Sequence, residues 1–377
     1  MNILYISNDS SLYGANRSLI DMATQIKKQG HQVYVLTWKH SAFVNELRRC
    51  GLTPIILGYK CCSYSDEWTD RDSLSDICRK NIKAIMKAGE YIKKYNIQVI
   101  HTNASNVDIG AWLSIWLRIP HVWHIREIMY DDYKLRYYYP RIMKWLYRKA
   151  ARMIFISKYI KQKRGYYSQN AMVLHNGINL KKYVDDSEKV ISQQEMRLLY
   201  AGVIREEKGI MDAIRVVEYL VKGYGYNVRL KIAGKKSQYL SYVLNYIKQK
   251  QLNDYIEYVG NKDDLRELRK WADIALMCSR SEALGRVTIE SMLARVLVVG
   301  ARAGATAELI KEGKNGYLYE ADNIKQMAEQ IIKVYDNPEQ SKEILQNAQR
   351  FAIQHFDNKI YANRMIELYE SLIGENN

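Results

Sequence analysis

Residues 273–290 read DIALMCSRSEALGRVTIE, and this stretch indicates the fold class of the chain. The apolar run at its start is short enough for a buried parallel strand, and residues 287–294 have the pattern of a helix. The loop between them carries Glu282, and Glu290 falls in the first turn of the helix. The stretch therefore predicts a strand–loop–helix unit with two carboxylates beside a helix N-terminus.

Two carboxylates at such a place favour a ligand that offers more than a phosphate. A helix N-terminus carries unpaired N–H groups and a partial positive charge, so it suits an anion. An ionised carboxylate only accepts hydrogen bonds and therefore needs donors such as hydroxyl groups. A sugar nucleotide offers both. For an isolated pair the simpler interpretation is one capping carboxylate and one solvated glutamate, so the choice depends on the rest of the chain.

The residues around this stretch repeat the strand–loop–helix pattern. Upstream, residues 202–209 form a glycine-bounded loop with Lys208 at the start of the next helix, where its charge can meet a diphosphate. Downstream, residues 300–308 form a loop of small residues before another helix. The other strands predicted in this half are residues 197–201, 228–233, 255–259 and 296–299. This alternation predicts a parallel, doubly wound sheet that binds its ligand at the carboxyl ends of the strands.

The first half of the chain shows the same alternation. Gly14, in the loop after the first strand, would let backbone approach a phosphate or sugar, although a glycine that simply begins a helix is an equal interpretation. A later strand is expected to deliver His124 into a loop beside Arg126 and Glu127, where it is either catalytic or structural. Residues 59–72 break the pattern and predict a surface loop or an insertion. The strands predicted here are residues 3–6, 33–37, 53–57, 98–101, 121–125, 153–156 and 172–174.

The length of 377 residues is enough for two domains with sizeable cores. We expect a Rossmann-like N-terminal domain over residues 1–180 and a second over residues 195–355. A polar linker is expected at 181–194 and a terminal helix within 356–377.

The composition indicates a folded protein with an anionic partner. Hydrophobic residues make up 47% of the chain, and the formal charge is +16. The five cysteines are odd in number and lack C-x-x-C spacing, so we expect reduced thiols rather than disulfides or a metal site. Because the apolar runs are too short to span a bilayer and the chain starts with a strand, we expect a cytoplasmic protein without a signal peptide.

The stretch from Tyr130 to Tyr166 is strongly basic and rich in tyrosine. It holds eleven Lys and Arg against Asp131 and Asp132, with eight tyrosines and Trp145 interleaved. Such a mixture suits the anionic headgroup layer of a membrane. A solvated basic face is the alternative. Single-stranded nucleic acid is the least favoured partner, and none is expected, because no nucleic-acid motif accompanies the stretch.

Several common motifs are missing from the sequence. There is no P-loop of the form G-x-x-x-x-G-K-[ST] and no convincing G-x-G-x-x-G dinucleotide fingerprint. There is also no G-x-S-x-G nucleophile elbow. These absences disfavour a P-loop nucleotidase, an oxidoreductase and a conventional hydrolase.

The ordered motifs resemble the family 4 glycosyltransferases of the GT-B fold, in which two Rossmann-like domains face a central cleft. The stretch from Glu282 to Glu290 resembles the family's E-x-F-G-x-x-x-x-E signature, with Leu284 in place of the usual aromatic residue. The resemblance covers essentially the whole chain. Three further segments are similar to family motifs: residues 303–308 to G-G-x-x-E, residues 175–178 to (P/H)-N-G-(I/V), and residues 13–15 to G-G-A.

The resemblance implies transfer of a hexose-type sugar from a UDP- or GDP-linked donor, with retention of configuration and without a metal or other cofactor. It implies a glycan or lipid-linked acceptor, as in surface polysaccharide synthesis, and the basic first domain suggests the inner face of a membrane. Glu282 and His124 would act at the donor sugar. Other positions would bind the donor: Gly14 and Lys208 at the phosphates, Gly285, Arg286 and Val287 through the helix start, and Glu290 at the ribose.

One position departs from the family pattern. The family usually has Arg directly after the glycine of its G-R-L-x-x-x-K-G motif, and Val203 stands there in this chain. Arg205 or Arg286 is the expected source of the second positive charge. By the same resemblance, the terminal helix is expected to pack on the first domain.

Two other functions remain open at this stage. Sugar-nucleotide epimerases and phosphorylases share this architecture, so the fold alone does not prove transfer to an acceptor. A polyanion-binding protein built around residues 130–166 would need no enzyme activity at all.

Overall fold

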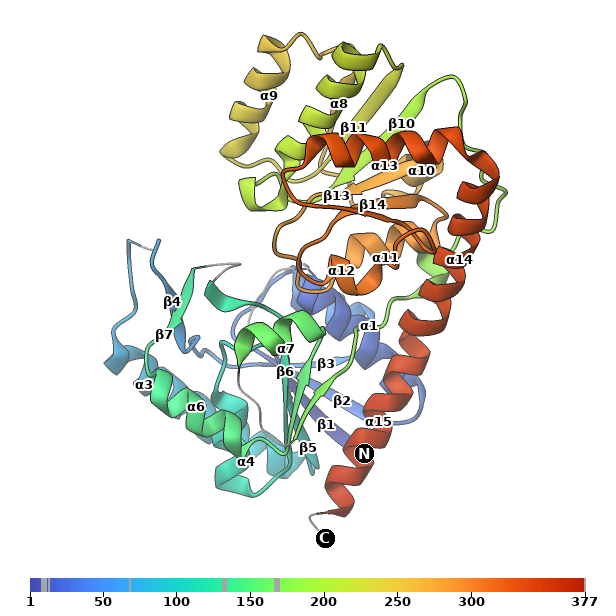
Figure 1. Cartoon of the computed structure of the whole chain (residues 1–377). Helices are drawn as coiled ribbons and strands as arrows, with labels where there is room; N and C mark the ends of the chain where they lie inside the picture. The colour runs from blue at the N-terminus through green and yellow to red at the C-terminus, as the bar shows by residue number, and fades with distance from the viewer. Residues whose placement is uncertain (8–11, 13, 68, 131–133, 166–169, 376–377) are drawn as a thin grey trace. The chain divides into compact units, whose positions relative to one another are not determined.

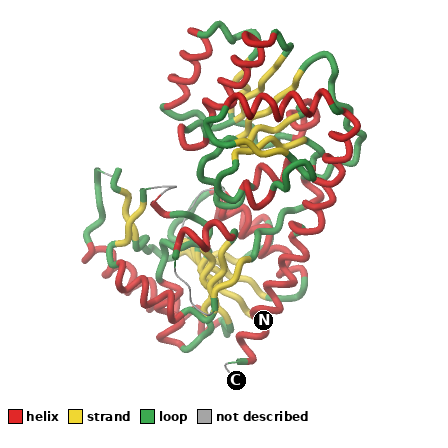
Figure 2. Tube along the Cα trace, viewed as in Figure 1, coloured by secondary structure: helices red, strands yellow, loops and turns green. Residues whose placement is uncertain are grey.

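The computed structural model of the chain describes residues 1–377 except 8–11, 13, 68, 131–133, 166–169 and 376–377. The chain forms two compact units (Figure 1). Residues 1–178 and 356–377 make up the first unit, and residues 179–355 make up the second. Each unit is built on a main parallel sheet with helices packed around it (Figure 2).

The main sheet of the first unit has seven parallel strands in the order β3-β2-β1-β5-β6-β8-β9. The order runs outward in both directions from β1 and β5, so the switch point of the sheet lies between these two strands. The strands are β1 (Asn2–Ile6), β2 (Gln32–Thr37), β3 (Thr53–Ile56), β5 (Val99–Thr102), β6 (His121–Ile125), β8 (Arg152–Phe155) and β9 (Ala171–Val173).

The helices of the first unit include the last helix of the chain, α15. Its residues Tyr361, Met365 and Tyr369 belong to the same buried cluster as the inner face of α1. The segment where the chain leaves the unit lies beside the segment where it returns, since the Ile178 N–H donates to the Phe356 carbonyl at 2.7 Å. The helices are α1 (Gly14–Lys28), α2 (Ala42–Arg49), α3 (Leu74–Lys94), α4 (Ile109–Leu117), α6 (Pro140–Lys149), α7 (Lys158–Arg164) and α15 (Asn358–Gly374).

The region predicted as a surface loop at 59–72 contains a strand, which corrects that expectation. Strand β4 (Ser63–Ser65) pairs in antiparallel fashion with β7 (Leu135–Tyr137). Three-residue strands carry no readable periodicity, and the pairing partner lies about 70 residues further along the chain. Neither property is visible in a local reading of the sequence.

The sheet of the second unit has six parallel strands in the order β12-β11-β10-β13-β14-β15. Relabelled from its first strand, this is the 3-2-1-4-5-6 order of a Rossmann fold, with the switch point between β10 and β13. The strands are β10 (Met196–Ala201), β11 (Val228–Ala233), β12 (Ile256–Gly260), β13 (Ile274–Met277), β14 (Leu297–Ala301) and β15 (Tyr317–Tyr319).

The helices of this unit follow the strands in alternation, as the sequence predicts. Short 3-10 helices stand at η1 (Leu180–Lys182) and η2 (Glu206–Lys208). The last helix ends at the boundary between the units. The α-helices are α8 (Ile210–Tyr224), α9 (Tyr239–Gln249), α10 (Arg266–Trp271), α11 (Arg286–Leu293), α12 (Thr306–Leu309), α13 (Ile324–Asp336) and α14 (Pro338–Phe356).

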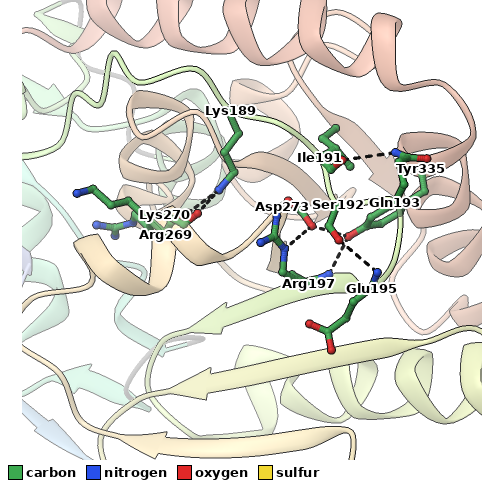
Figure 3. Close-up of polar contacts among 10 residues, drawn as sticks. All are labelled: Lys189, Ile191, Ser192, Gln193, Glu195, Arg197, Arg269, Lys270, Asp273 and Tyr335. Atoms are coloured by element: carbon green, nitrogen blue, oxygen red, sulfur yellow. Dashed lines mark hydrogen bonds and ion pairs between the residues drawn. The ribbon is translucent and has the colours of Figure 1, made fainter.

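The polar segment at 181–194 belongs to the second unit, and Figure 3 shows polar contacts of its residues Lys189, Ile191, Ser192 and Gln193. The Lys189 ammonium donates to the Arg269 carbonyl at 3.1 Å, and burial lowers the pKa of Lys189 to about 8. Close by, the Arg197 guanidinium makes a two-point contact with buried Asp273, at 2.7 and 3.0 Å. This pair ties together the starts of β10 and β13, whose other ends form the candidate site.

Candidate functional site

The candidate site of the second unit lies at the carboxyl ends of β10 and β13. Lys208 comes from the loop after β10, and Glu282 comes from the loop after β13. The Lys208 Nζ lies 2.9 Å from the Glu282 Oε2, and the two side chains are 33% and 20% exposed. The switch point of the sheet therefore presents a cation and a carboxylate that ligands can reach.

Backbone contacts hold the two loops together. Gly209 has a φ of +66°, and a Cβ at this position would lie 2.0 Å from the Cys278 carbonyl oxygen. The Tyr200 hydroxyl donates to the Lys208 carbonyl at 3.1 Å. The Arg280 N–H donates to the Glu207 carbonyl at 3.2 Å. Only glycine fits at Gly209 without separating the loops, since it combines a left-handed conformation with backbone contact.

The side chain of Arg280 anchors the Glu282 loop to neighbouring elements. It forms ion pairs with Asp212 at 3.1 Å and with Asp322. Asp212 is fully buried at the start of α8 and also accepts from the Tyr319 hydroxyl at 3.3 Å. This arrangement fixes the loop to α8 and β15, which limits how far Glu282 can move.

The loop of small residues after β14 packs directly on Glu282. The Ala305 N–H donates to the Glu282 carbonyl at 2.8 Å. Gly304 has a φ of +56°, and a Cβ there would lie 2.5 Å from the Glu282 nitrogen. Residues 303–308, which resemble a family motif in the sequence, therefore support the backbone of Glu282.

Glu290 sits in α11 between two arginines. Its Oε2 accepts from the Arg269 Nη2 at 2.5 Å, and its Oε1 accepts from the Arg286 Nε at 2.8 Å. The Glu290 side chain is only 10% exposed, and that of Arg269 is 3% exposed. Two cations share one carboxylate, so the cluster carries excess positive charge that favours a further anion nearby.

Arg269 was not predicted from the sequence. It lies in α10, whose sequence RELRKW reads as an ordinary charged surface helix. Its guanidinium also stands 5.5 Å from the ring of Tyr183. Nothing in the local pattern of α10 marks one arginine as buried, because its partner Glu290 comes from a different helix.

The remaining predicted residues of this unit surround the start of α11 and the loop after β10. Gly285 is the N-cap of α11 with a φ of +83°, and Val287 lies half-buried in the first turn. Arg286 is engaged with Glu290. Arg205 is exposed, and its side chain makes no ion pair with any residue that the structure describes, while the neighbouring Val203 is also exposed. Of the two arginines considered for the second charge, Arg205 is thus the one without a carboxylate partner among the described residues.

In the first unit, His124 belongs to the strand predicted at 121–125 and is not delivered into the loop that follows it. It lies within β6, and its side chain is fully buried. The physical reason is that β6 is an inner strand of a parallel sheet, so both of its faces are covered. Its Nδ1 lies 3.2 Å from the His101 Nε2 and 3.3 Å from the Arg126 Nη2. Burial, with Arg126 and His101 close by, holds the pKa of His124 well below its usual value, so the ring is neutral at pH 7.

Arg126, which the sequence placed only beside His124, is the centre of this region. The Arg126 side chain donates to the Asn103 Oδ1 at 2.8 Å and to the Asn176 Oδ1 at 2.6 Å. All three side chains are buried. Because Asn103 follows β5 and Asn176 belongs to the 175–178 segment, Arg126 joins three strand ends of the first sheet.

Gly14 begins α1 and is exposed, with nothing within 4 Å of a Cβ built on it. Its neighbour Tyr13 lies outside the described residues. Within the described part of the chain, no three His, Cys, Asp or Glu side chains are grouped so that they could hold a metal ion. In the same part, no helix is long and apolar enough to cross a membrane.

Two family descriptions match the chain, one for each half. "Glycosyltransferase Family 4" matches residues 13–182, and "Glycosyl transferases group 1" matches residues 183–351. The chain belongs to the family 4 glycosyltransferases. The two matches together cover nearly all of the two sheets described above.

This glycosyltransferase is similar to several curated proteins. It is 26% identical over 273 residues to the uncharacterized glycosyltransferase MJ1178 of Methanocaldococcus jannaschii, covering 69% of the chain and 72% of the relative. It is 24% identical over 217 residues to the capsular polysaccharide biosynthesis glycosyltransferase CapM of Staphylococcus aureus, covering 53% and 54%. It is 24% identical over 182 residues to the N-acetyl-alpha-D-glucosaminyl L-malate synthase of Bacillus anthracis, covering 48% of the chain and 46% of the relative. The matches thus span about half of the latter two relatives.

Solved structures confirm the predicted fold class, the GT-B fold with two doubly wound α/β domains. The structure of Anabaena Alr3699/HepE in complex with UDP superimposes with a TM-score of 0.82 at 21% identity, covering 98% of this chain and all of the other. A glycosyltransferase from Rickettsia africae superimposes with a TM-score of 0.79 at 20% identity, covering 99% and 98%. At these identities the likeness establishes the fold alone.

The predicted residues of the glycosyltransferase fall into two groups, one in each unit. In the second unit, Lys208, Glu282 and the start of α11 gather at one edge of the sheet, and Glu290 stands behind them in its arginine cluster. In the first unit, Gly14 and His124 belong to α1 and β6. The structure adds Arg269 to the second group and Arg126 to the first.

Proposed function

We propose that this glycosyltransferase moves a hexose-type sugar from a UDP- or GDP-linked donor to a glycan or lipid-linked acceptor, with retention of configuration. The observation that carries the donor assignment is the Lys208–Glu282 pair, 2.9 Å apart at the switch point of the second sheet. Similar proteins support it: Alr3699/HepE has been solved with UDP and with UDP-glucose, and CapM is named for capsule synthesis. We infer a role in surface polysaccharide synthesis on the same grounds.

The charges at this edge suit the bond that must break. Cleavage between the sugar and the diphosphate leaves negative charge on the phosphate and positive charge on the sugar ring. Lys208 and the backbone N–H groups from Gly285 to Val287 would stabilise the leaving diphosphate, and each such donor contributes a factor of about 10²–10³ in rate. Glu282 would accept hydrogen bonds from the sugar hydroxyls, as an ionised carboxylate can.

Glu290 would accept from the ribose hydroxyls with the lone pairs that its arginines leave free. Arg286 holds this carboxylate, so we assign the second charge at the diphosphate to Arg205. Gly14, which carries no side chain, would let backbone approach a phosphate closely. We do not assign His124 to the donor sugar; its buried contacts make it a support for Arg126.

For retention, we propose attack on the face from which the diphosphate leaves. The acceptor hydroxyl forms the new bond to the anomeric carbon, the bond to the phosphate oxygen breaks, and that oxygen takes the hydroxyl proton. This route needs no carboxylate nucleophile, and we propose it without a metal or other cofactor. A covalent sugar adduct on Glu282, detected by mass spectrometry, would contradict it.

The proposed location is the cytoplasmic face of a membrane. The basic, tyrosine-rich stretch from 130 to 166 supports it, although residues 131–133 and 166 lie outside the described part of the chain. Anionic headgroups attract such a stretch through its positive charge. A lipid-linked acceptor would be presented at the same surface.

The donor assignment is tested by thermal unfolding with UDP, GDP and their sugar derivatives. A ligand that binds only the folded state at one hundred times its Kd adds about 2.7 kcal/mol of stability. We expect one nucleotide class to raise the Tm, and Lys208→Ala and Glu282→Gln to remove most of that rise. The matched control is Lys222→Ala, which breaks a surface lysine–glutamate pair on α8, 3.3 Å long, away from the site.

Two outcomes would contradict the proposal. One is a panel in which no nucleotide raises the Tm. The other is interconversion of two nucleotide sugars without an acceptor, which would favour the epimerase instead. A polyanion-binding protein would be favoured if the chain bound oligonucleotides, if Lys208→Ala left that binding unchanged, and if no nucleotide changed the Tm.

A further inference from the structure

Three neighbouring helices of the first unit expose large apolar side chains on one connected surface. The most exposed are Met86 at 62%, Ile82 at 58% and Trp116 at 53%. Monomeric soluble proteins seldom expose apolar patches of this kind without a function. We call the surface the α3–α4–α6 face; it comprises Ile82 and Met86 of α3, Ile115 and Trp116 of α4, and Ile142 and Trp145 of α6.

Contacts between the helices make this surface continuous. Ile82, Met86 and Gly89 lie on one stripe of α3, and the ring of Trp116 packs over Gly89. One turn earlier in α4, Trp112 has its ring centroid 6.0 Å from that of Trp145 in α6. Figure 1 shows α3, α4 and α6 together on one side of the first unit. The exposed residues therefore form one surface rather than isolated positions.

The charged residues around this surface are almost all basic. On α3, α4 with its C-cap Arg118, and α6, ten exposed side chains are Lys or Arg and one, Glu90, is acidic. Two of the ten are paired with carboxylates of α3, Arg79 with Asp76 and Lys87 with Glu90. Two of the ten, Lys144 and Arg148, stand beside Trp145 on α6, and Lys149 reaches over its ring at 5.8 Å. Long basic side chains can lay their stems on apolar surface while their charges point to headgroups.

We propose that the α3–α4–α6 face docks on an anionic lipid surface, with its apolar side chains entering the headgroup boundary and its basic residues pairing with lipid phosphates. Tryptophan beside Lys and Arg suits the membrane–water interface, because its ring can contact the lipid while its N–H group stays in contact with water. Mutual repulsion of the basic residues disfavours a second copy of the chain on this face.

Nucleic acid is disfavoured on the same face. Of the three most exposed apolar side chains of the face, only Trp116 is aromatic, and Met86 and Ile82 of α3 offer no ring on which a base can stack. The inference extends the membrane location proposed above and gives it a surface, most of which lies outside residues 130–166. It does not depend on sugar transfer, so its test needs neither donor nor acceptor.

The test is sedimentation of the full chain with phosphatidylcholine vesicles and with vesicles of equal parts phosphatidylcholine and phosphatidylglycerol. We expect binding to the anionic vesicles only, weakened by added salt. Ile82→Ser with Met86→Ser should lower the partition coefficient by roughly tenfold, from the apolar area withdrawn. Lys144→Ser with Arg148→Ser should lower it by roughly thirtyfold, from two lost headgroup attractions.

The matched control is Tyr242→Ser with Leu244→Ser, which removes two exposed apolar side chains, at 52% and 41%, from α9 of the second unit. It should bind vesicles as the unchanged chain does. Lys208→Ala should also bind them normally, whereas the face variants should keep their Tm and their response to nucleotide. Failure of this inference and failure of the donor assignment are thereby distinguished.

Several results would overturn the inference. Vesicle binding that both face variants leave unchanged would place any membrane contact elsewhere on the chain. Absence of binding to the anionic vesicles would refute it outright. Two results without vesicle binding would identify a different occupant of the face. One is oligonucleotide binding by the unchanged chain that both face variants lose. The other is self-association of the unchanged chain that Ile82→Ser with Met86→Ser abolishes.

Discussion

Replacing Glu290 by Gln should destabilise the second unit much more than the same change at Glu282. Glu290 is 10% exposed and forms ion pairs with Arg269 at 2.5 Å and with Arg286 at 2.8 Å. Without its charge, two largely buried guanidinium groups lose the carboxylate that they share, at a cost of roughly 3 kcal/mol. Glu282 is 20% exposed and has Lys208, 33% exposed, as its ion-pair partner, so its loss should cost about 0–1 kcal/mol.

The assay is differential scanning calorimetry of the two variants. For a domain of this size, 1 kcal/mol shifts the Tm by roughly 2–4 °C, so Glu290→Gln should lower it by about 6–12 °C and Glu282→Gln by at most about 4 °C. Adding Arg269→Met to Glu290→Gln should recover part of the loss, because one uncompensated cation is removed. Equal losses at the two glutamates, or no recovery in the double variant, would refute the reasoning.

Two further predictions concern backbone conformation and pH. Gly209→Ala should destabilise the protein by several kcal/mol in urea unfolding, because its Cβ would meet the Cys278 carbonyl, whereas Gly225→Ala, with a similar φ of +68° and nothing within 4 Å, should cost about 1–2 kcal/mol; equal costs would argue against the loop contact. Burial lowers the pKa of three inner histidines, that of His121 to about 3. The pKa values of these histidines in the folded protein lie below the unfolded value of about 6.5. The free energy of unfolding is therefore highest above about pH 6.5 and decreases as the pH falls toward the folded pKa values. For each histidine the decrease is up to about 1.4 kcal/mol per pH unit. Urea titrations should show this slope and a shallower one for His121→Gln; a flat profile below about pH 6.5 would contradict it.

The fold class follows from local patterns in the sequence. Strands and helices alternate with short loops, and β11 falls on the predicted residues 228–233. Apolar runs of strand length followed by amphipathic helices can bury both faces only in a doubly wound sheet. Helix α4 was not predicted, because its sequence IGAWLSIWL is apolar on nearly every side and shows no helical period.

The candidate site was predictable where a loop follows a strand of the parallel sheet. Lys208 and Glu282 were both predicted as site residues because each follows a strand, and parallel strands bring such loops to one edge of the sheet. The support of the site was not predictable. Gly304 looks like an ordinary loop glycine until its contact with the Glu282 backbone is seen.

The sequence by itself determined the class of fold and the loops that carry charge, because periodicity and loop position are local properties. Only the tertiary structure decided which charges meet. Arg269 and Glu290 are 21 residues apart and pair because α10 and α11 pack on the same sheet. His124 looked like a loop residue and is buried, since its strand is covered on both faces. Apolar residues of α3, α4 and α6 form one surface only because the fold sets those helices side by side.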